Sequence, residues 1–414
     1  MIVKNKDCRM CGGKKFKLVI DFGKNPLVNS LIEKKDLAGR EPVFPLVVKR
    51  CQACSLVQVT DIVDSHEIYK NVDYLYFSGD MPGLKEYFQE YANDIQERLL
   101  TPGNFVVEIG SNDGLMLEMF KEKYKILGVD PSSNVVVRAL KNNIPTVSDF
   151  FNERLAQSIA REFGQANVVY GNNCIAHLNN LRDLMGGVEA LLAKNGVFVV
   201  ECNYWGGMVK NKNYALIYHD HFSYFSLKNW VDFAPRFGMK VCDAIVTPAQ
   251  GGSLRVFMKK GTAAMTARCK KLYQEEIATN LNSQATCDRY RKDVLLEAKK
   301  LHALVADLRF AKKKIIAGYG AAAKGFSVLK LAGINEKHIN YFVDDSPAKQ
   351  GKFTPVAHIP VISRKEADRK LPDYFFITAP NYERIIVAKE DTFRKNGGKF
   401  ITVDSRIIET FDGF

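Results

Sequence analysis

The spacing of hydrophobic residues divides the chain into three stretches of different character. In residues 1–75 the apolar runs are short, at 16–22 and 43–48, and they carry no helical period. Runs of this length between polar segments are typical of strands. We therefore expect this stretch to form a small unit built on strands.

Residues 76–300 alternate between helical and strand patterns. An aromatic- and acid-rich helix is expected over 84–100, and an amphipathic run follows at 115–123. Strands are expected over 104–109, 125–129, 167–170 and 196–201. Such alternation predicts a parallel sheet with helices on both faces.

The last stretch, residues 301–414, starts afresh after apolar residues at helical spacing over 294–310. A strand over 314–318, a glycine- and alanine-rich turn and a helix come first. Further strands are expected over 339–343, 374–378 and 399–403. The pattern predicts a second, smaller α/β unit, so the chain as a whole belongs to the α/β class.

Composition narrows the class of protein. The 414 residues are 46% hydrophobic, which is typical of a globular protein, and no apolar run approaches the ~20 residues that cross a bilayer. The N-terminus has no apolar signal-peptide core, so we expect a cytoplasmic protein without a membrane partner. The net charge of +13 would attract an anion, either nucleic acid or a smaller phosphorylated ligand. Much of this charge lies in amphipathic segments such as 289–314, which favours a generally basic surface.

Four of the nine cysteines form two Cys-x-x-Cys pairs, Cys8 with Cys11 and Cys51 with Cys54, with 39 residues between the pairs. Two such turns can complete a tetrahedron of thiolates around Zn²⁺, and four protein ligands leave no open position. The spacing therefore predicts a structural zinc site. A thioredoxin-like redox pair is the competing interpretation, but neither pair lies in the βαβ setting that it needs.

A strand end, a glycine turn and a helix start follow one another over residues 106–114. Gly110 and Gly114 allow backbone to approach a cofactor, and Asp130 before Pro131 ends the next strand, where a carboxylate can hold ribose hydroxyls. The layout suits S-adenosylmethionine or a dinucleotide. Because the loop lacks Gly-x-Gly-x-x-Gly spacing, methyl transfer is favoured over hydride transfer. The candidate cofactor residues of the loop are Glu108, Gly110, Asn112, Asp113 and Gly114.

Further residues fit the same cleft. Asp149 and Phe150 precede a helix and could contact adenine, although Phe150 is equally suited to anchoring that helix. Asn172 and Asn173 end the next strand, and the carboxyl ends of parallel strands line the ligand crevice. We assign Asn172 to the cofactor and Asn173 to the substrate.

A cluster of polar side chains, Tyr218, His219, Asp220 and His221, contains two of only seven histidines. Metal binding is one interpretation, but His-Asp-His in sequence needs an unusual backbone to converge on one ion. Acid–base chemistry is the other, since imidazole titrates near neutral pH and a carboxylate can set its tautomer.

Together these segments resemble one family, the zinc-containing S-adenosylmethionine-dependent sugar C-methyltransferases of deoxysugar biosynthesis. The resemblance runs in order through nearly the whole chain, over the cysteine pairs and residues 108–114, 172–177, 218–226, 250–255, 318–325 and 342–345. It implies three domains: a zinc-binding domain (1–75), a central Rossmann-like methyltransferase domain (76–300) and a C-terminal Rossmann-like α/β domain that helps to hold a nucleotide-sugar (301–414).

The resemblance implies C-3 methylation of a 4-keto-6-deoxy sugar on a nucleoside diphosphate, dTDP or GDP. A proton next to a ketone is acidic enough for an enzymic base, and the resulting enolate carbon can attack the sulfonium methyl group. We expect no nucleic-acid partner and a monomer or weak homodimer. Two other hypotheses stay open: a zinc-ribbon RNA-binding methyltransferase, which the charge and cysteines suggest, and an NAD-dependent sugar-nucleotide oxidoreductase.

The family pattern also implies catalytic roles. His221 would be the base with Tyr218 and Asp220 beside it, His177 would donate to the enolate, and Tyr76 would close over the cofactor. This chain departs from the pattern at Asp220, where the family usually has glutamate. A second departure is Gln250, where histidine is expected.

In the last unit, residues 318–325 look like a dinucleotide loop and more plausibly support the substrate's diphosphate or nucleotide. Lys324 offers a charge at a helix start. Asp344 and Ser346 follow the next strand, where an acid could bind ribose. A Rossmann-like unit that only shapes the cleft is the competing interpretation.

Overall fold

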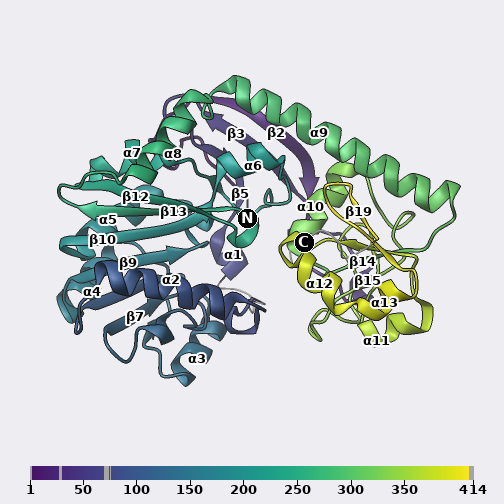
Figure 1. Ribbon diagram of the computed structural model, residues 1–414, viewed down its shortest axis with the longest axis horizontal. Coiled ribbons are helices and arrows are strands. Elements are labelled where there is room, and N and C mark those ends of the chain that lie inside the picture. The colour runs from purple at the N-terminus through teal and green to yellow at the C-terminus, as the bar shows by residue number, and fades with distance from the viewer. Residues whose placement is uncertain (1, 28–29, 70–73, 75, 410–414) are drawn as a thin grey trace.

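The computed structural model describes residues 2–27, 30–69, 74 and 76–409. Two α/β lobes lie side by side, and the long helix α9 (Gln284–Ala306) runs across the top of both (Figure 1). The predicted α/β class is confirmed. The described part of the chain holds no helix with the length and apolar content that a membrane span requires.

A seven-stranded sheet forms the larger lobe, in the order β12-β13-β10-β9-β6-β7-β8. Its strands are β6 (Phe105–Ile109), β7 (Lys125–Val129), β8 (Thr146–Val147), β9 (Ala166–Asn172), β10 (Leu192–Asn203), β12 (Met239–Thr247) and β13 (Ser253–Lys260). Only β13 runs against its neighbours in this sheet. The four strands predicted between residues 104 and 201 all occur in it. The parallel pairs bring the carboxyl ends of β6, β7, β9 and β10 to one edge.

Helices cover both faces of this sheet. They include α2 (Leu84–Leu99), α3 (Ser133–Lys141), α4 (Glu153–Phe163) and α5 (Leu181–Leu191). The helix expected over 84–100 is therefore confirmed.

The amphipathic run at 115–123 forms only a short 3-10 helix, Leu117–Met119. Its apolar residues, such as Leu117 and Phe120, are buried in one core cluster with Phe88 and Ile95 of α2. Because α2 already covers this face of the sheet, the run packs beneath that helix and no long helix forms from it.

The cysteine-bearing segment builds a four-stranded sheet in the order β11-β4-β3-β2. Three strands come from the N-terminal stretch: β2 (Phe16–Asn25), β3 (Phe44–Cys51) and β4 (Val57–Val59). The fourth, β11 (Ser223–Tyr224), begins two residues after His221 and pairs antiparallel with β4. A separate ribbon joins β1 (Ile2–Lys4) to β5 (Asp61–Val63). The N-terminal segment therefore shares a sheet with the chain that carries the histidines.

The smaller lobe contains a six-stranded sheet in the order β16-β15-β14-β17-β18-β19. Its strands are β14 (Ile316–Tyr319), β15 (Phe342–Val343), β16 (Val361–Ile362), β17 (Tyr374–Ile377), β18 (Lys399–Ile401) and β19 (Ile407–Ile408). Helices α10 (Ala323–Ala332) and α12 (Glu383–Lys389) belong to the same lobe. All four predicted strands occur, although β15 is shorter than the range 339–343.

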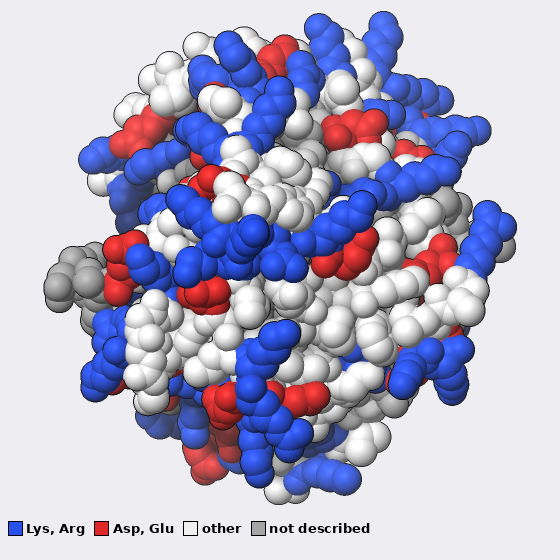
Figure 2. Space-filling view, turned by 90° about the vertical axis from the view of Figure 1, so that its right-hand side faces the viewer, with Lys and Arg blue, Asp and Glu red and all other residues white. Residues whose placement is uncertain are grey.

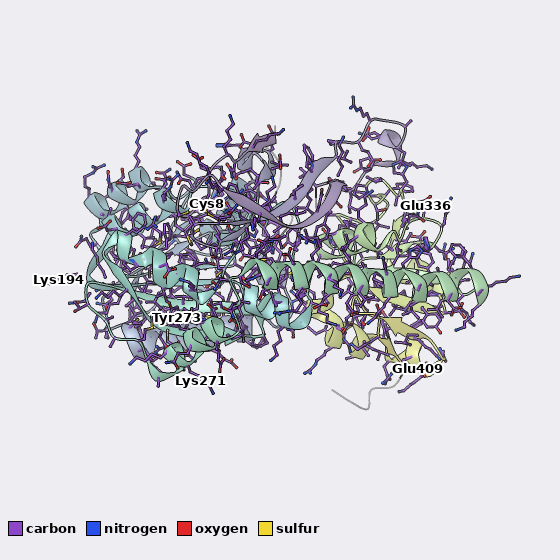
Figure 3. All side chains as sticks on the ribbon, turned by 90° about the horizontal axis from the view of Figure 1, so that it is seen from above. Cys8, Lys194, Lys271, Tyr273, Glu336 and Glu409 are labelled. Atoms are coloured by element: carbon purple, nitrogen blue, oxygen red, sulfur yellow. The ribbon has the colours of Figure 1, made fainter. Side chains whose placement is uncertain are left out.

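The N-terminal segment touches both lobes. Arg50 Nε donates to Asn282 O just before α9 at 2.6 Å, and Ile32 forms an isolated bridge with Phe353. Seen from above, α9 runs parallel to the long axis, from near the middle of the molecule to the end of the smaller lobe, beside the N-terminal strands (Figure 3). Figure 2 shows the face of the smaller lobe, where Lys and Arg side chains are interspersed with Asp and Glu side chains. That face agrees with a generally basic surface.

Candidate active site

A cavity of about 890 Å³ lies between the lobes, at the carboxyl ends of the parallel strands in the larger sheet. A volume of this size suits a cofactor together with a substrate. The predicted site residues that line it are Tyr76, Gly110, Asn112, Asp130, Pro131, Phe150, Asn172, Asn173, His177, Tyr218, His221 and Lys324. Seven others do not line it: Glu108, Asp113, Gly114, Asp149, Asp220, Asp344 and Ser346.

The turn after β6 brings backbone close to the next strand ends. Gly110 has a φ of 67°, and a Cβ placed there would lie 2.6 Å from the Cβ of Cys174. Only glycine fits such a position without displacing a neighbour. Asn112 N donates to Asp130 Oδ2 at 3.0 Å, and Ser132 N donates to Asp130 Oδ1 at 2.9 Å. Two backbone donors therefore hold the Asp130 carboxylate at the cavity wall.

Burial raises the pKa of Asp130 to about 6, while the backbone donors partly offset this effect. The carboxylate is therefore ionised near neutral pH. It keeps acceptor capacity for the hydroxyl groups of a ligand.

Asn112 and Asp113 also hold the segment that carries Tyr76. Asn112 Nδ2 donates to Tyr76 O at 2.9 Å, and Gly79 N donates to Asp113 Oδ2 at 3.0 Å. Burial raises the pKa of Tyr76, and the Gln250 side chain partly offsets this rise. Asp113 thus supports the turn beside Tyr76 and does not face the cavity.

Glu108 lies beneath the loop. It accepts from Tyr170 OH at 3.1 Å and from Asn172 Nδ2 at 3.4 Å, and burial raises its pKa well above the usual range. Asn172 Oδ1 has no hydrogen-bond partner among the described residues, although Asn172 lines the cavity. The glycine turn, the Asp130 carboxylate and this buried, unpaired amide oxygen together fit S-adenosylmethionine, with its amine, its sulfonium and its ribose hydroxyls.

Two histidines, His177 and His221, lie next to each other in the lining of the same cavity, with ring centroids 5.0 Å apart. His177 lies in a 3-10 turn, Ile175–His177, and its Nδ1 is 2.5 Å from Tyr69 OH. His221 Nε2 is 2.7 Å from Tyr218 OH. The sequence motifs at 172–177 and 218–226 therefore meet at one point.

The surroundings of His221 define its tautomer. Nδ1 lies 2.8 Å from Leu216 O, which can only accept, so the ring proton belongs on Nδ1. Asn203 Nδ2 lies 2.8 Å from the same Nδ1; with the ring proton on Nδ1, the Asn203 amide is turned so that its oxygen faces that N–H. Nε2 then carries the lone pair and accepts from Tyr218.

Both histidines are neutral near pH 7. Burial lowers the pKa of His177 to about 4, and it lowers the pKa of His221 well below the usual value, with a further contribution from His177. A neutral imidazole can accept a proton, which is the first requirement of a general base.

Asp220 lies outside the cavity lining and does not set the His221 tautomer, contrary to the interpretation drawn from the sequence. Leu216 and Asn203 occupy that position instead. Burial raises the pKa of Asp220 to about 7. Burial also raises the pKa of Tyr69 and of Tyr218, and the Asp220 charge adds to both of these rises. The carboxyl group therefore acts on the tyrosines around the histidines.

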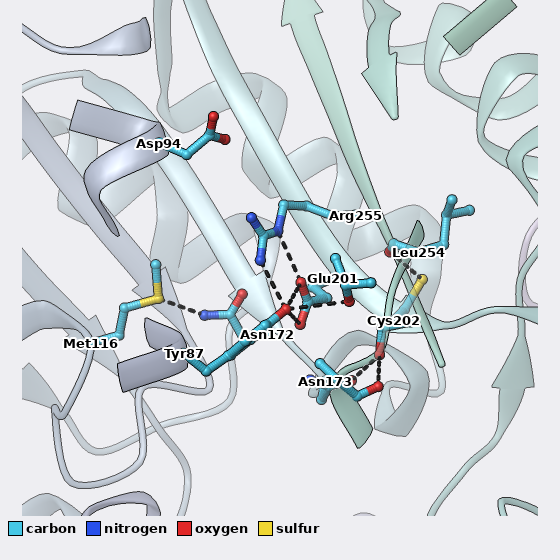
Figure 4. Close-up of polar contacts among 12 residues, drawn as sticks. Tyr87, Asp94, Met116, Asn172, Asn173, Glu201, Cys202, Leu254 and Arg255 are labelled. Atoms are coloured by element: carbon cyan, nitrogen blue, oxygen red, sulfur yellow. Dashed lines mark hydrogen bonds and ion pairs between the residues drawn. The ribbon is translucent and has the colours of Figure 1, made fainter. Parts of the chain in front are cut away.

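Three residues that line the cavity, Tyr69, Tyr87 and Asn203, were not predicted from the sequence. A buried network joins Tyr87 to Glu201 and Arg255 (Figure 4): Tyr87 OH donates to Glu201 at 2.6 Å, and Arg255 Nε donates to Glu201 at 2.9 Å. Asn203 lies two residues beyond Glu201, at the carboxyl end of β10. Because ligands bind at the carboxyl ends of parallel strands, this position could have been predicted from the sequence. Tyr69 had no comparable signal.

The smaller lobe contributes Lys324 from the start of α10. Lys324 Nζ donates to Gln250 Oε1 at 3.1 Å, and Asn381 Nδ2 donates to the same oxygen at 3.0 Å. Burial lowers the Lys324 pKa to about 7. Gln250, which replaces the histidine of the family pattern, therefore connects both lobes over the cavity.

Asp344 and Ser346 lie elsewhere in that lobe. Asp344 accepts from Ala321 N at 2.8 Å, from Ser346 N at 2.9 Å and from Lys349 Nζ at 3.1 Å. Its carboxylate is thus occupied by the protein's own donors.

The four paired cysteines converge, with their sulfur atoms within 4.8 Å of one another. Cys8 and Cys54 are 3.5 Å apart at sulfur, and Cys11 and Cys51 are 3.6 Å apart. Zn–S bonds of ~2.3 Å at tetrahedral angles give edges of about 3.8 Å, so the set fits zinc. Gln58 Nε2 donates to Cys8 Sγ at 3.1 Å, an outer contact typical of thiolate ligands.

Comparison with known proteins defines the class. Three family models match in order: a zinc binding domain over residues 8–69, a methyltransferase domain over 84–243 and a C-methyltransferase C-terminal domain over 248–403. The chain is an S-adenosylmethionine-dependent C-methyltransferase that also binds zinc.

One curated relative covers almost the whole chain. C-methyltransferase NovU from Streptomyces niveus is 32% identical over 400 residues, which cover 95% of this chain and 94% of that protein. The chain belongs to this family of zinc-containing C-methyltransferases.

Solved structures with a similar fold include an S-adenosylmethionine-dependent methyltransferase from Listeria monocytogenes (12% identity, 43% of this chain and 100% of that one, TM-score 0.34). Another is the magnesium protoporphyrin IX methyltransferase from Synechocystis (13% identity, 43% and 83%, TM-score 0.34). These likenesses are too distant to carry an argument about function.

Proposed function

We propose that this C-methyltransferase acts at C-3 of a nucleotide-linked 4-keto-6-deoxy sugar, carried by dTDP or GDP, in branched deoxysugar biosynthesis. The observation that carries the proposal is the pair of buried neutral histidines, His177 and His221, 5.0 Å apart in the cavity that also holds the glycine loop. Carbon methylation next to a ketone needs a neutral base and a donor to the enolate oxygen.

His221 Nε2 takes the C-3 proton, and the substrate's C–H replaces the Tyr218 hydroxyl as its neighbour. Tyr218 can then donate to a sugar oxygen. With Tyr69 donating to Nδ1 of His177, the Nε2–H of His177 is left to stabilise the enolate oxygen. S-adenosylmethionine supplies an electrophilic methyl group on a sulfonium sulfur.

The cofactor contacts follow from the loop. Asp130 accepts from the ribose hydroxyls, and Asn172 Oδ1 accepts from the amine of the methionine part. Tyr76 closes over the cofactor from the segment held by Asn112.

The smaller lobe holds the diphosphate. Lys324, Arg384 and Arg406 line that wall of the cavity. Burial lowers the Lys324 pKa to about 7, and a phosphate group beside it would favour its charged form. Asn173 lies on the opposite wall, near the sugar. We also propose a cytoplasmic location, where a reducing environment keeps the cysteines available to zinc.

The test is incubation with methyl-labelled S-adenosylmethionine and a panel of dTDP- and GDP-linked 4-keto-6-deoxy sugars, each with a hydroxyl or an amino group at C-3. We expect the labelled methyl group on C-3 of the product. Without the methyl donor, we expect the C-3 proton of the substrate to exchange for solvent deuterium through the enolate. His221→Gln should lower both rates by about 10³-fold, with cofactor affinity retained.

His302→Gln, which changes a histidine outside the cavity, is the matched control. Label transfer to no sugar in the panel, or normal turnover by His221→Gln, would contradict the proposal. Salt-sensitive labelling of RNA would support the RNA methyltransferase hypothesis instead.

A further inference from the structure

Arg9 stands between two of the zinc-ligand cysteines, Cys8 and Cys11, yet its side chain points toward the histidines. The side chain is buried, with 3% of its surface exposed. Its Nη1 donates to Phe222 O at 3.1 Å, and its Nε donates to Asn179 Oδ1 at 3.1 Å. Phe222 directly follows His221, and Asn179 lies two residues after His177.

Backbone hydrogen bonds join the segments around these contacts to the zinc-binding segment. Phe222 N donates to Ala176 O at 2.8 Å, and Val59 N donates to Phe222 O at 2.9 Å. The two histidine-bearing segments are therefore bonded to each other and to β4. Arg9 adds to these bonds, because its single guanidinium group donates to both histidine-bearing segments.

Gln58 connects the same guanidinium to a zinc ligand. Its Oε1 accepts from Arg9 Nη1 at 3.2 Å, and its Nε2 donates to Cys8 Sγ at 3.1 Å. Four thiolates around a divalent ion carry a net negative charge, which compensates a buried cation beside them. The charge and the hydrogen bonds both tie Arg9 to the cysteine cluster.

We propose that Arg9 is a positioning residue that couples the cysteine cluster to the histidine pair. It holds the His177 and His221 segments at the separation that methyl transfer requires, and it takes no part in cofactor binding. The inference rests on the proposed roles of the two histidines. A displacement of about 1 Å at reacting groups lowers rates by about 10²-fold, so modest movement has a large effect.

The test uses Arg9→Gln in the full-length, zinc-loaded protein. Arg50→Gln is the matched control, because Arg50 also adjoins a zinc ligand, Cys51, but bonds Ser55 and the start of α9. The measurements are zinc content, cofactor affinity, kcat and KM, and the ring signals of ¹⁵N-labelled histidines.

In Arg9→Gln we expect kcat to fall about 10²-fold, with cofactor affinity within about twofold of the unsubstituted protein. The ring signals of His177 and His221 should move, while those of His302 and His338 stay. Arg9→Lys keeps the positive charge but loses the planar set of N–H donors. It should therefore retain zinc and have a kcat between those of Arg9→Gln and the unsubstituted protein. Arg50→Gln should change neither kcat nor these signals.

Unchanged kcat and unchanged His177 and His221 signals in folded Arg9→Gln would overturn the inference, and so would an equal effect of Arg50→Gln. If Arg9→Gln does not fold, Asn179→Ala removes one acceptor alone and should still shift the His177 signal and lower kcat. If no nucleotide-sugar is methylated, the proposed function fails, while the ring signals still test the coupling.

Discussion

Each of the two α/β units holds an aspartate at a strand end through two backbone amides, but only one of the two aspartates remains accessible to a ligand. In the larger lobe the loop amide of Asn112 bonds Asp130, whose second oxygen accepts from the amide two residues on. In the smaller lobe Ala321 and Ser346 make the equivalent bonds to Asp344. The difference is Lys349, whose ammonium bonds both Asp344 and Ala321 O at 3.1 Å.

The comparison shows that a loop and an acid do not by themselves make a binding site. Asp130 lines the cavity, whereas Asp344 is neutralised by its own chain and lies outside the lining. Ribose binding at Asp344 would require Lys349 to move. Whether such an aspartate can bind a ligand therefore depends on whether another side chain of the protein already pairs with its carboxylate.

The largest expected difference between the units concerns their loop glycines. Gly110→Ala should lower the free energy of unfolding by about 2–4 kcal/mol, because the new Cβ would sit 2.6 Å from Cys174 at positive φ. Gly320 also has positive φ, but a Cβ there would lie 3.4 Å from Ala379, so Gly320→Ala should cost only about 1 kcal/mol. Urea unfolding measures both, and equal losses would refute the contrast.

A second difference concerns the two acids. Asp130→Asn should weaken S-adenosylmethionine binding by about 30- to 150-fold, since charge-assisted hydrogen bonds contribute about 2–3 kcal/mol. Asp344→Asn should leave that affinity unchanged. Calorimetric titration of each variant decides the point, and equal affinities in the two variants would mean that Asp130 does not touch the cofactor.

The smallest effect is a dependence of binding on pH. The Asp130 pKa is raised to about 6, so the carboxylate becomes protonated as the pH falls through that value. Affinity for S-adenosylmethionine should therefore be about tenfold lower one unit below this pKa than well above it. Asp130→Asn should show a flat profile over the same range, and a flat profile in the unsubstituted protein would exclude this role.

Local patterns were sufficient for much of the fold. The strands β6, β7, β9 and β10 and the helix α2 follow from runs whose hydrophobic period is set by neighbours along the chain. The helix predicted over 115–123 was wrong, because α2 already covers the face of the sheet on which that helix would pack. Only the packing of the chain reveals this. The cavity residues Asn112, Asp130 and Asn172 were found from their places at strand ends, and Tyr69 and Gln250 were not found as site residues because their contacts are with distant segments.

The sequence by itself determined the four cysteines as a metal cluster, the glycine loop before its acid, and the histidine-bearing motifs, because each depends on residue type and short spacing. Only the tertiary structure decided that Leu216 and Asn203 orient His221, that Lys349 closes over Asp344, and that Arg9 reaches both histidine segments. Arg9 lies 213 and 170 residues from its two partners, whereas Leu216 and Lys349 lie only five residues from theirs and meet them through the conformation of loops. Their geometry follows from how the sheets pack, which no local spacing encodes.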